Sequence, residues 1–133
     1  MSTLLASCAV PMQATPSGRP EVLLLNTTPA EVLPRVVLSY AVSGEKVKRT
    51  TPHSATFSRR ADDLGMMLAF GSMLNSVPEL RTTLTLVKVG RDTQVFAIRE
   101  AITNPNSAYE SSVDVTRVAG SELQKRLEAL QDE

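Results

Sequence analysis

The residues with the clearest potential for chemistry lie between positions 46 and 60, in the sequence KVKRTTPHSATFSRR. This segment holds five basic residues, the only histidine of the chain, one phenylalanine and no acid. Cations this close together can neutralise several phosphates, and Phe57 can stack on a base. The candidate RNA contacts in the segment are Lys46, Lys48, Arg49, Arg59 and Arg60. The alternative interpretation is a solvated edge strand whose lysines prevent unwanted strand pairing.

Catalytic and metal-binding groups are sparse. The 133 residues include one cysteine and one histidine, Cys8 and His53. A zinc site needs several such ligands, so we expect no metal. Asp62 and Asp63 are adjacent and would point about 100° apart on a helix, which suits a helix start better than a paired acid and base. No glycine-rich phosphate loop is present. The sequence therefore predicts no enzyme, no cofactor and no small-molecule substrate.

Charge is distributed unevenly along a chain whose formal net charge is zero. Positions 1–60 carry seven basic and three acidic residues, whereas positions 61–133 carry seven basic and eleven acidic residues. Such polarity suits an anionic partner, or copies of the chain that pack head to tail.

Targeting and membrane segments are not expected. No apolar run approaches eighteen residues, which predicts no membrane span. The sequence LLASC at residues 4–8 resembles a lipoprotein cleavage site, but only MST precedes it. We interpret it as part of a strand, with Cys8 as a small buried side chain. A lone cysteine also agrees with a reducing compartment.

The first half of the chain is expected to form strands before one apolar helix. Residues 3–10 and 21–26 flank a Pro- and Gly-containing loop, which predicts an N-terminal hairpin and connector over residues 1–32. In the segment 33–60, residues 35–44 are β-branched and aromatic and predict a strand. HSATFS predicts a short edge strand. Residues 61–77 predict a helix that is apolar nearly all round.

The second half predicts a sheet and a final helix. Within residues 80–118, two alternating strands flank the turn GRD, and a third strand follows an Asn-Pro loop. Residues 120–131 predict a helix with Ser121 as N-cap and Gln124 as its capping partner. The chain is thus expected to be a single domain over residues 1–133. Its class is α+β, with an N-terminal β-hairpin and an antiparallel sheet of about five strands on which two helices pack.

Two stretches carry a family resemblance. STLLASCAV and PEVLLLNTTP resemble the hairpin that opens the coat proteins of single-stranded RNA bacteriophages. The run from Glu79 to Leu130 is similar to the core that follows, a strand, a tight turn, a strand, an Asn-Pro loop and a Tyr-bearing strand entering a helix. The resemblance implies a capsid protein of the virion, assembled in the host cytoplasm, with itself and RNA as partners.

The same resemblance implies particular contact residues. Coat proteins of this family form dimers in which the helices grip the partner and one sheet face meets RNA. Further RNA contacts are implied on the matching strands, at Thr83, Thr85, Lys88, Thr93, Arg99 and Arg117. Dimer or oligomer contacts are predicted on the helices, at Met66, Phe70, Met73, Leu123, Leu127 and Leu130. For the helix at 61–77, a central core position is the other interpretation.

A second resemblance gives an alternative function. From residue 35, the predicted order of strand, strand, helix, three strands and helix also looks like the small roadblock-type dimerisation modules. Those modules pair through a helix and a sheet edge, and they scaffold other cytoplasmic proteins. This alternative implies a small cytoplasmic homodimer without nucleic acid.

Overall fold

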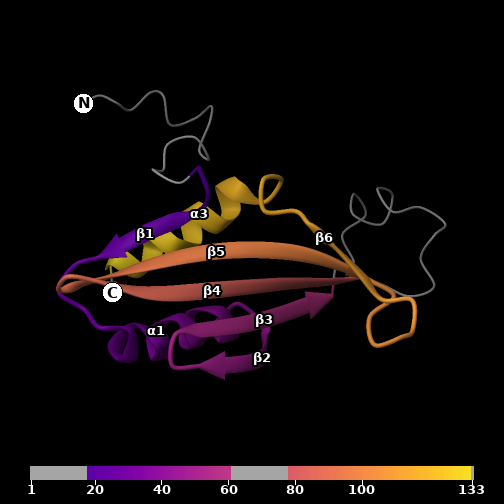
Figure 1. Cartoon of the computed structure of the whole chain (residues 1–133), viewed down its shortest axis with the longest axis horizontal. Coiled ribbons are helices and arrows are strands. Elements are labelled where there is room, and N and C mark those ends of the chain that lie inside the picture. Colours follow the sequence, from indigo (N-terminus) through magenta and orange to yellow (C-terminus); the bar gives the residue numbers. More distant parts are fainter. Residues whose placement is uncertain (1–17, 61–77, 133) are drawn as a thin grey trace.

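A computed structural model describes residues 18–60 and 78–132. Six strands form one antiparallel sheet in the order β1-β5-β4-β3-β2, and β6 also pairs with β5 (Figure 1). Two α-helices accompany the sheet, which confirms the predicted α+β class. The elements are β1 Glu21–Leu24, α1 Pro29–Val42, β2 Lys46–Thr51, β3 Ser54–Arg60, β4 Glu79–Val89, β5 Asp92–Thr103, β6 Ser111–Asp114, α3 Gly120–Ala129 and the 3-10 helix η4 Leu130–Asp132. The predicted strand at 3–10 and helix at 61–77 lie outside the described residues.

The long hairpin of β4 and β5 agrees with the alternation in the sequence. Its two strands pair from Glu79 with Ile102 to Val89 with Asp92. Gly90 occupies the turn with φ of 61°, a left-handed conformation that glycine adopts without steric cost. Alternate side chains along both strands are buried. The hairpin is therefore the centre of the sheet: β3 pairs with β4, β1 and β6 pair with β5, and β2 is added through β3.

Helix α1 replaces the connector and strand that were predicted over residues 27–44, and that prediction is wrong. Thr28 caps the helix through its side chain, and Glu31 completes a capping box with the Thr28 backbone N–H. Pro29 suits the first turn, where its missing N–H costs nothing. Val32, Val36 and Tyr40 recur every four residues and are buried together on one helix face. Burial of this stripe outweighs the strand preference of the valines and Tyr40.

The basic segment forms a hairpin whose order in the sheet also differs from the prediction. β3, which includes most of HSATFS, lies between β2 and β4 and is not an edge strand. β2 is the edge strand instead. Its pairing with β3 shifts between Val47 and Arg49, which marks a β-bulge. The bulge places Lys46 and Arg49 on one face, whereas simple alternation predicts opposite faces.

The C-terminal segment has a shorter strand and a differently capped helix than predicted. β6 contains only four residues, and Tyr109 precedes it. The N-cap of α3 is Ala119, with no side-chain hydrogen bond, so the predicted Ser121 cap is wrong. Gln124 bonds to β1 instead, because its amide reaches the backbone of Glu21.

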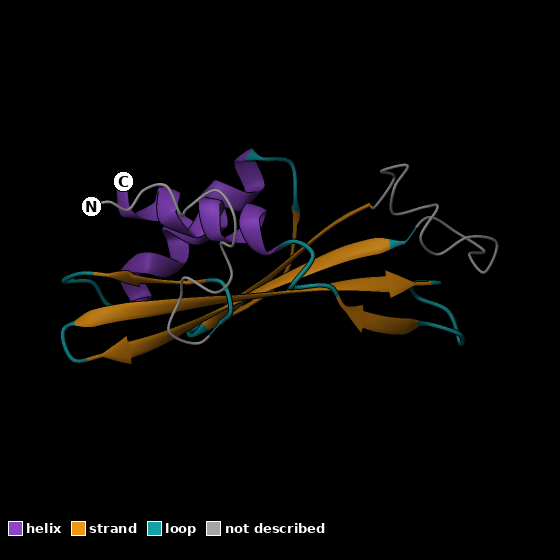
Figure 2. Ribbon diagram, turned by 90° about the horizontal axis from the view of Figure 1, so that it is seen from above, coloured by secondary structure: helices purple, strands orange, loops and turns teal. Residues whose placement is uncertain are grey.

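Both helices lie on one side of the sheet and enclose the core there (Figure 2). From the helices, Leu123, Leu127 and Leu130 join the α1 stripe, and each is fully buried in the chain itself. Their predicted role as intersubunit contacts is therefore wrong, because they already pack on their own sheet. The sheet contributes Val22, Leu24, Ala55, Phe57, Leu84, Leu86, Val95 and Ala97 to this core. Met66, Phe70 and Met73 lie outside the described residues.

Candidate functional site

The face of the sheet opposite the helices is the candidate site. We call it the open face, because no helix of the described ranges 18–60 and 78–132 covers it (Figure 2). Cross-strand pairing assigns residues of all six strands to it. They are Glu21, Leu23, Lys46, Arg49, Thr51, Ser54, Thr56, Ser58, Arg60, Glu79, Arg81, Thr83, Thr85, Val87, Val89, Asp92, Gln94, Phe96, Ile98, Glu100, Ile102, Ser112 and Asp114. On β2, β3 and β4 the cationic groups and, apart from the buried Ser58, the hydroxyl groups of this face are half-buried or exposed.

Cations gather on the part of the open face formed by β2, β3 and β4. One cross-strand row runs from Lys46 through Ser58 to Arg81. The next runs from Arg49 through Thr56 to Thr83, where the two threonine hydroxyls are 3.2 Å apart. Together these rows form a platform of cations and hydroxyl donors that suits phosphate oxygens.

A single acid lies among these open-face cations on β2, β3 and β4. The Glu79 carboxylate contacts Arg81 at 3.1 Å and Lys48 at 3.7 Å. By contrast, Lys46, Arg49 and Arg60 form no ion pair within the part of the chain that the structure describes. Within the described ranges, no acidic side chain therefore competes with an anionic ligand for these three cations.

Six of the eleven residues predicted as RNA contacts lie on the open face or reach it, and the other five do not. Lys46, Arg49, Arg60, Thr83 and Thr85 lie on the open face. Lys48, at the bulge, reaches the same face through its contact with Glu79. The pairing places other predicted contacts on the helix-covered side, namely Arg59, Lys88, Thr93 and Arg99. Arg117 lies in the turn between β6 and α3.

Arg99 is a structural residue and not an exposed cation. Its side chain is 2% exposed and lies between the sheet and α3. Nε donates to the Thr82 hydroxyl at 2.9 Å, and Nη1 contacts the Glu122 carboxylate at 3.2 Å. The Arg99 backbone N–H donates to Thr116 Oγ1 at 2.9 Å. This network joins β5 to β4 and to the start of α3, so Arg99 cannot reach RNA on the opposite face.

Phe57 cannot stack on a base either. The side chain is fully buried, and its ring stacks on Tyr40 with centroids 4.7 Å apart and an interplanar angle of 15°. Phe96 is the phenylalanine of the open face, where it lies opposite Thr85. Phe96 is not predictable as a ligand contact from the sequence, because alternation alone does not say which face of the hairpin the helices cover.

A cluster of charged and aromatic groups fixes the start of β2. Arg126 of α3 donates from Nη1 to Glu45 and from Nη2 to the Ser43 hydroxyl, each at 2.6 Å. The same guanidinium lies 3.7 Å from the centroid of the Tyr40 ring. Glu45 directly precedes the first cation of the platform, Lys46. The cluster therefore holds the end of α1 and the beginning of β2 against α3.

Burial in this cluster predicts alkaline sensitivity. Desolvation raises the pKa of Tyr40 from 10.0 to about 12, while Arg126 opposes the shift. The unfolded chain ionises first, so stability is complete below pH 10 and is lost as pH rises from 10 to about 12. The whole effect is about 3 kcal/mol. The test uses a Tyr109→Phe variant, in which Tyr40 is the single tyrosine. As pH is raised, we expect ionisation of Tyr40, measured by tyrosinate absorbance, to coincide with unfolding, measured by circular dichroism. Ionisation without unfolding would contradict this.

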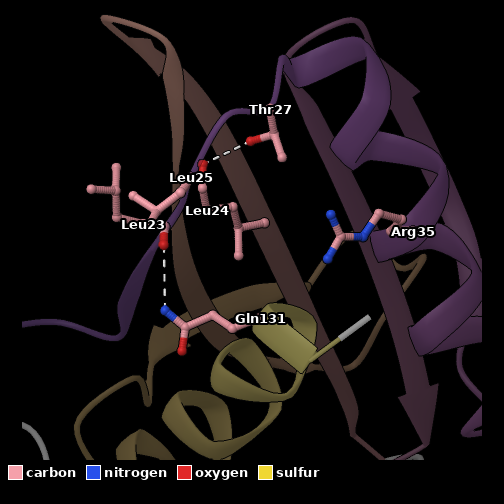
Figure 3. A pocket seen from close by; sticks show the side chains of 6 residues that line it. All are labelled: Leu23, Leu24, Leu25, Thr27, Arg35 and Gln131. Carbon is pink, nitrogen blue, oxygen red and sulfur yellow. Dashed lines mark hydrogen bonds between the residues drawn. The ribbon is translucent and has the colours of Figure 1, made fainter.

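One cavity lies away from the open face, between β1, α1 and η4 (Figure 3). Its volume is about 320 Å³, and its lining residues are Leu23, Leu24, Leu25, Thr27, Arg35 and Gln131. The polar side chains that line the cavity donate hydrogen bonds to backbone carbonyls. Thr27 Oγ1 donates to the carbonyl of Leu24, Gln131 Nε2 to that of Leu23, and Arg35 Nη2 to that of Leu130. The cavity is thus a seam between elements, with its polar groups engaged in holding them together.

Other kinds of site receive no support within the described ranges. No cluster of three or more histidine, cysteine or acidic side chains there could hold a metal ion. No helix among those residues is long and apolar enough to cross a membrane. No protein-family model matches the chain, and no curated protein is detectably similar to it in sequence.

Proposed function

We propose that this chain is a self-assembling structural protein, the building block of a capsid, and that its open face contacts the enclosed RNA. One observation carries the proposal. Among residues 18–60 and 78–132, α1 and α3 cover the same side of the sheet, and cations that form no ion pair with another described residue gather on the opposite side. An uncovered sheet face is accessible to a long ligand. The location that follows is the virion, after assembly in the host cytoplasm.

The chemistry of the open face suits a flexible polyanion. Lys46 and Arg49 lie on the edge strand and Arg60 at the end of its neighbour, so the charges spread over the surface. Thr56, Thr83 and Thr85 supply hydroxyl groups that donate to phosphate or to the 2′-hydroxyl of RNA. Spread cations and hydroxyls bind the backbone of RNA and give little base specificity.

The first experiment is size-exclusion chromatography of the recombinant protein with absorbance at 260 and 280 nm. The chain has no tryptophan and two tyrosines, so protein absorbance is weak and co-purified RNA is conspicuous. We expect large uniform particles with high absorbance at 260 nm and RNA that nuclease removes only after disassembly. A small dimer free of RNA would overturn the proposal and favour the roadblock-like alternative.

Three substitutions on the open face test the RNA contact. The triple variant Lys46→Ala, Arg49→Ala, Arg60→Ala removes the open-face cations that form no ion pair with another described residue. For a single-stranded oligonucleotide, each lost phosphate contact lowers the slope of log affinity against log salt by about 0.7, so the triple should lower it by about 2. Fluorescence anisotropy over a salt series measures this slope.

A matched triple variant provides the control. Lys88→Ala, Arg91→Ala, Lys125→Ala removes the same charge from exposed residues that are not part of the open face. We expect its salt slope to equal that of the wild type. Equal slopes for both triples would mean that the open face does not contact RNA.

A further inference from the structure

The edges of the sheet differ in how well they are protected. The outer edge of β1 is closed by side chains from the C-terminal helical segment. Gln124 accepts from the Glu21 N–H and donates to the Glu21 carbonyl, both at 2.9 Å, as a neighbouring strand would. Gln131 donates to the Leu23 carbonyl at 3.3 Å. No further strand can pair at this edge while α3 is in place.

Two other strands keep an outer edge. β2 ends the sheet, and its residues 46–50 are all exposed. β6 pairs with β5 alone among the described strands, and its four residues are also exposed. An uncovered edge presents unpaired backbone groups and is a template for pairing with another chain.

The two edges carry opposite charge. Lys46, Lys48 and Arg49 make β2 basic, so a second β2 is an unfavourable partner because like charges would lie opposite each other. Glu110 precedes β6 and Asp114 ends it. Hydrogen bonds from Thr116 lower the pKa of Asp114 and keep it charged at neutral pH. Lys46 and Asp114 are the two ends of one cross-strand row on the open face.

The apolar residues of the two edges also match. Val47 is 44% exposed and Val113 is 47% exposed, and both lie on the helix side of the sheet. Alignment of Val47 with Val113 of another copy places Ser112 of that copy beside Lys46 on the open face. Past the bulge, Asp114 of that copy falls beside Arg49. One register therefore places Arg49 beside Asp114 on one face and Val47 beside Val113 on the other.

We propose that β2 of one copy pairs with β6 of a second copy, side by side, so that the sheet continues from chain to chain. The contact rests on the proposed function, since it is the one through which the shell would grow. β2 and β6 are four strands apart in an antiparallel order and point the same way, so the new pair is parallel. The contact joins two different edges, so a pair of copies still has one free β2 edge and one free β6 edge. Further copies can add there, and the contact repeats into a ring or an extended array. The open faces of all copies then lie on the same side of the continuous sheet.

A charge-swap experiment tests the contact. The first variant, Lys46→Glu with Arg49→Glu, makes both edges acidic. The second, Glu110→Lys with Asp114→Lys, makes both edges basic. The protein is first disassembled and freed of RNA by nuclease. Sedimentation velocity at low ionic strength then measures its assembly, and circular dichroism checks that each variant folds. We expect each variant alone to remain unassembled, and their equimolar mixture to regain the assemblies of the wild type.

A milder variant guards against a local fold defect. Asp114 accepts from the Thr116 N–H at 2.8 Å, and Glu110 accepts from the Asn106 N–H at 2.7 Å. Glu110→Gln with Asp114→Asn keeps an acceptor at each position and removes the charge. We expect it to assemble more weakly than the wild type, and assembly equal to the wild type would contradict the contact.

The outcomes separate this contact from the proposed function. If each charge-swapped variant still assembles alone, or if the mixture stays unassembled, the contact between β2 and β6 is overturned while a capsid that encloses RNA can stand. A third outcome is that wild-type protein assembles without RNA, that the mixture of the two variants also assembles, and that the protein has no affinity for RNA. This outcome would support the contact and overturn the RNA function. If the first variant no longer binds RNA but still assembles without RNA, the β2 cations are assigned to RNA and the contact is overturned.

Discussion

Replacing Arg126 with alanine is expected to lower the free energy of unfolding by about 3–5 kcal/mol. The Arg126 side chain is 19% exposed and its partner Glu45 is only 2% exposed. Without the guanidinium, the Glu45 carboxylate stays buried with no counter-charge, and the Ser43 hydroxyl loses the N–H that donates to it. The Tyr40 ring also loses the cation over its face. Urea denaturation followed by circular dichroism measures the loss.

Two further variants identify the source of that loss. Lys125→Ala removes an exposed cation from the adjacent position of α3 and should change stability by less than about 0.5 kcal/mol. Arg126→Lys keeps the charge but cannot donate to Glu45 and Ser43 through one planar fork, so an intermediate loss is expected. A loss below about 1 kcal/mol for Arg126→Ala would show that water screens the pair as on a surface.

The same cluster links stability to the candidate site. Glu45 is the last residue before β2, and Lys46 is the first cation of the open face. Arg126 thus holds the start of the edge strand against the body of the protein. We expect Arg126→Ala to weaken RNA binding through disorder of that strand, although Arg126 itself lies on the helix side.

The central hairpin was predictable from the sequence. β4 and β5 are rich in β-branched residues on both sides of a glycine turn. Side chains two apart lie on the same face, as the period of a strand predicts. Helix α1 was missed because Val36, Val37 and Tyr40 favour strands by propensity. The better signal was the spacing of four between Val32, Val36 and Tyr40, preceded by Thr28 and Glu31 as a capping box.

The candidate site was harder to predict for two physical reasons. Alternation divides residues between two faces but does not say which face the helices cover, so Arg99 and Thr83 looked equally available. Packing decides between them, since Arg99 lies beneath α3 while Thr83 lies on the open face. The bulge after Val47 reverses the face on which each later side chain of β2 lies, and the residue types do not predict it.

Phe57→Ala is expected to lower the free energy of unfolding by about 3–5 kcal/mol. The ring is fully buried between the sheet and α1, and it stacks on Tyr40 at 4.7 Å. Its strand is internal, so neighbouring strands cannot close over the space that the ring leaves. The matched control is Phe96→Ala, the same substitution on the open face, where the side chain is only half-buried and the loss should stay below about 1.5 kcal/mol.

Phe57→Leu then separates the two roles that the sequence left open. Leucine fills most of the space and should fold with a smaller loss than alanine, but it cannot stack on a base. If Phe57 is a core residue, folded Phe57→Leu protein binds an RNA oligonucleotide with the affinity and salt slope of the wild type. A base stack is worth about 1–3 kcal/mol, so a loss of about fivefold or more in affinity, with stability unchanged, would return Phe57 to the RNA surface and overturn the assignment of the two sheet faces.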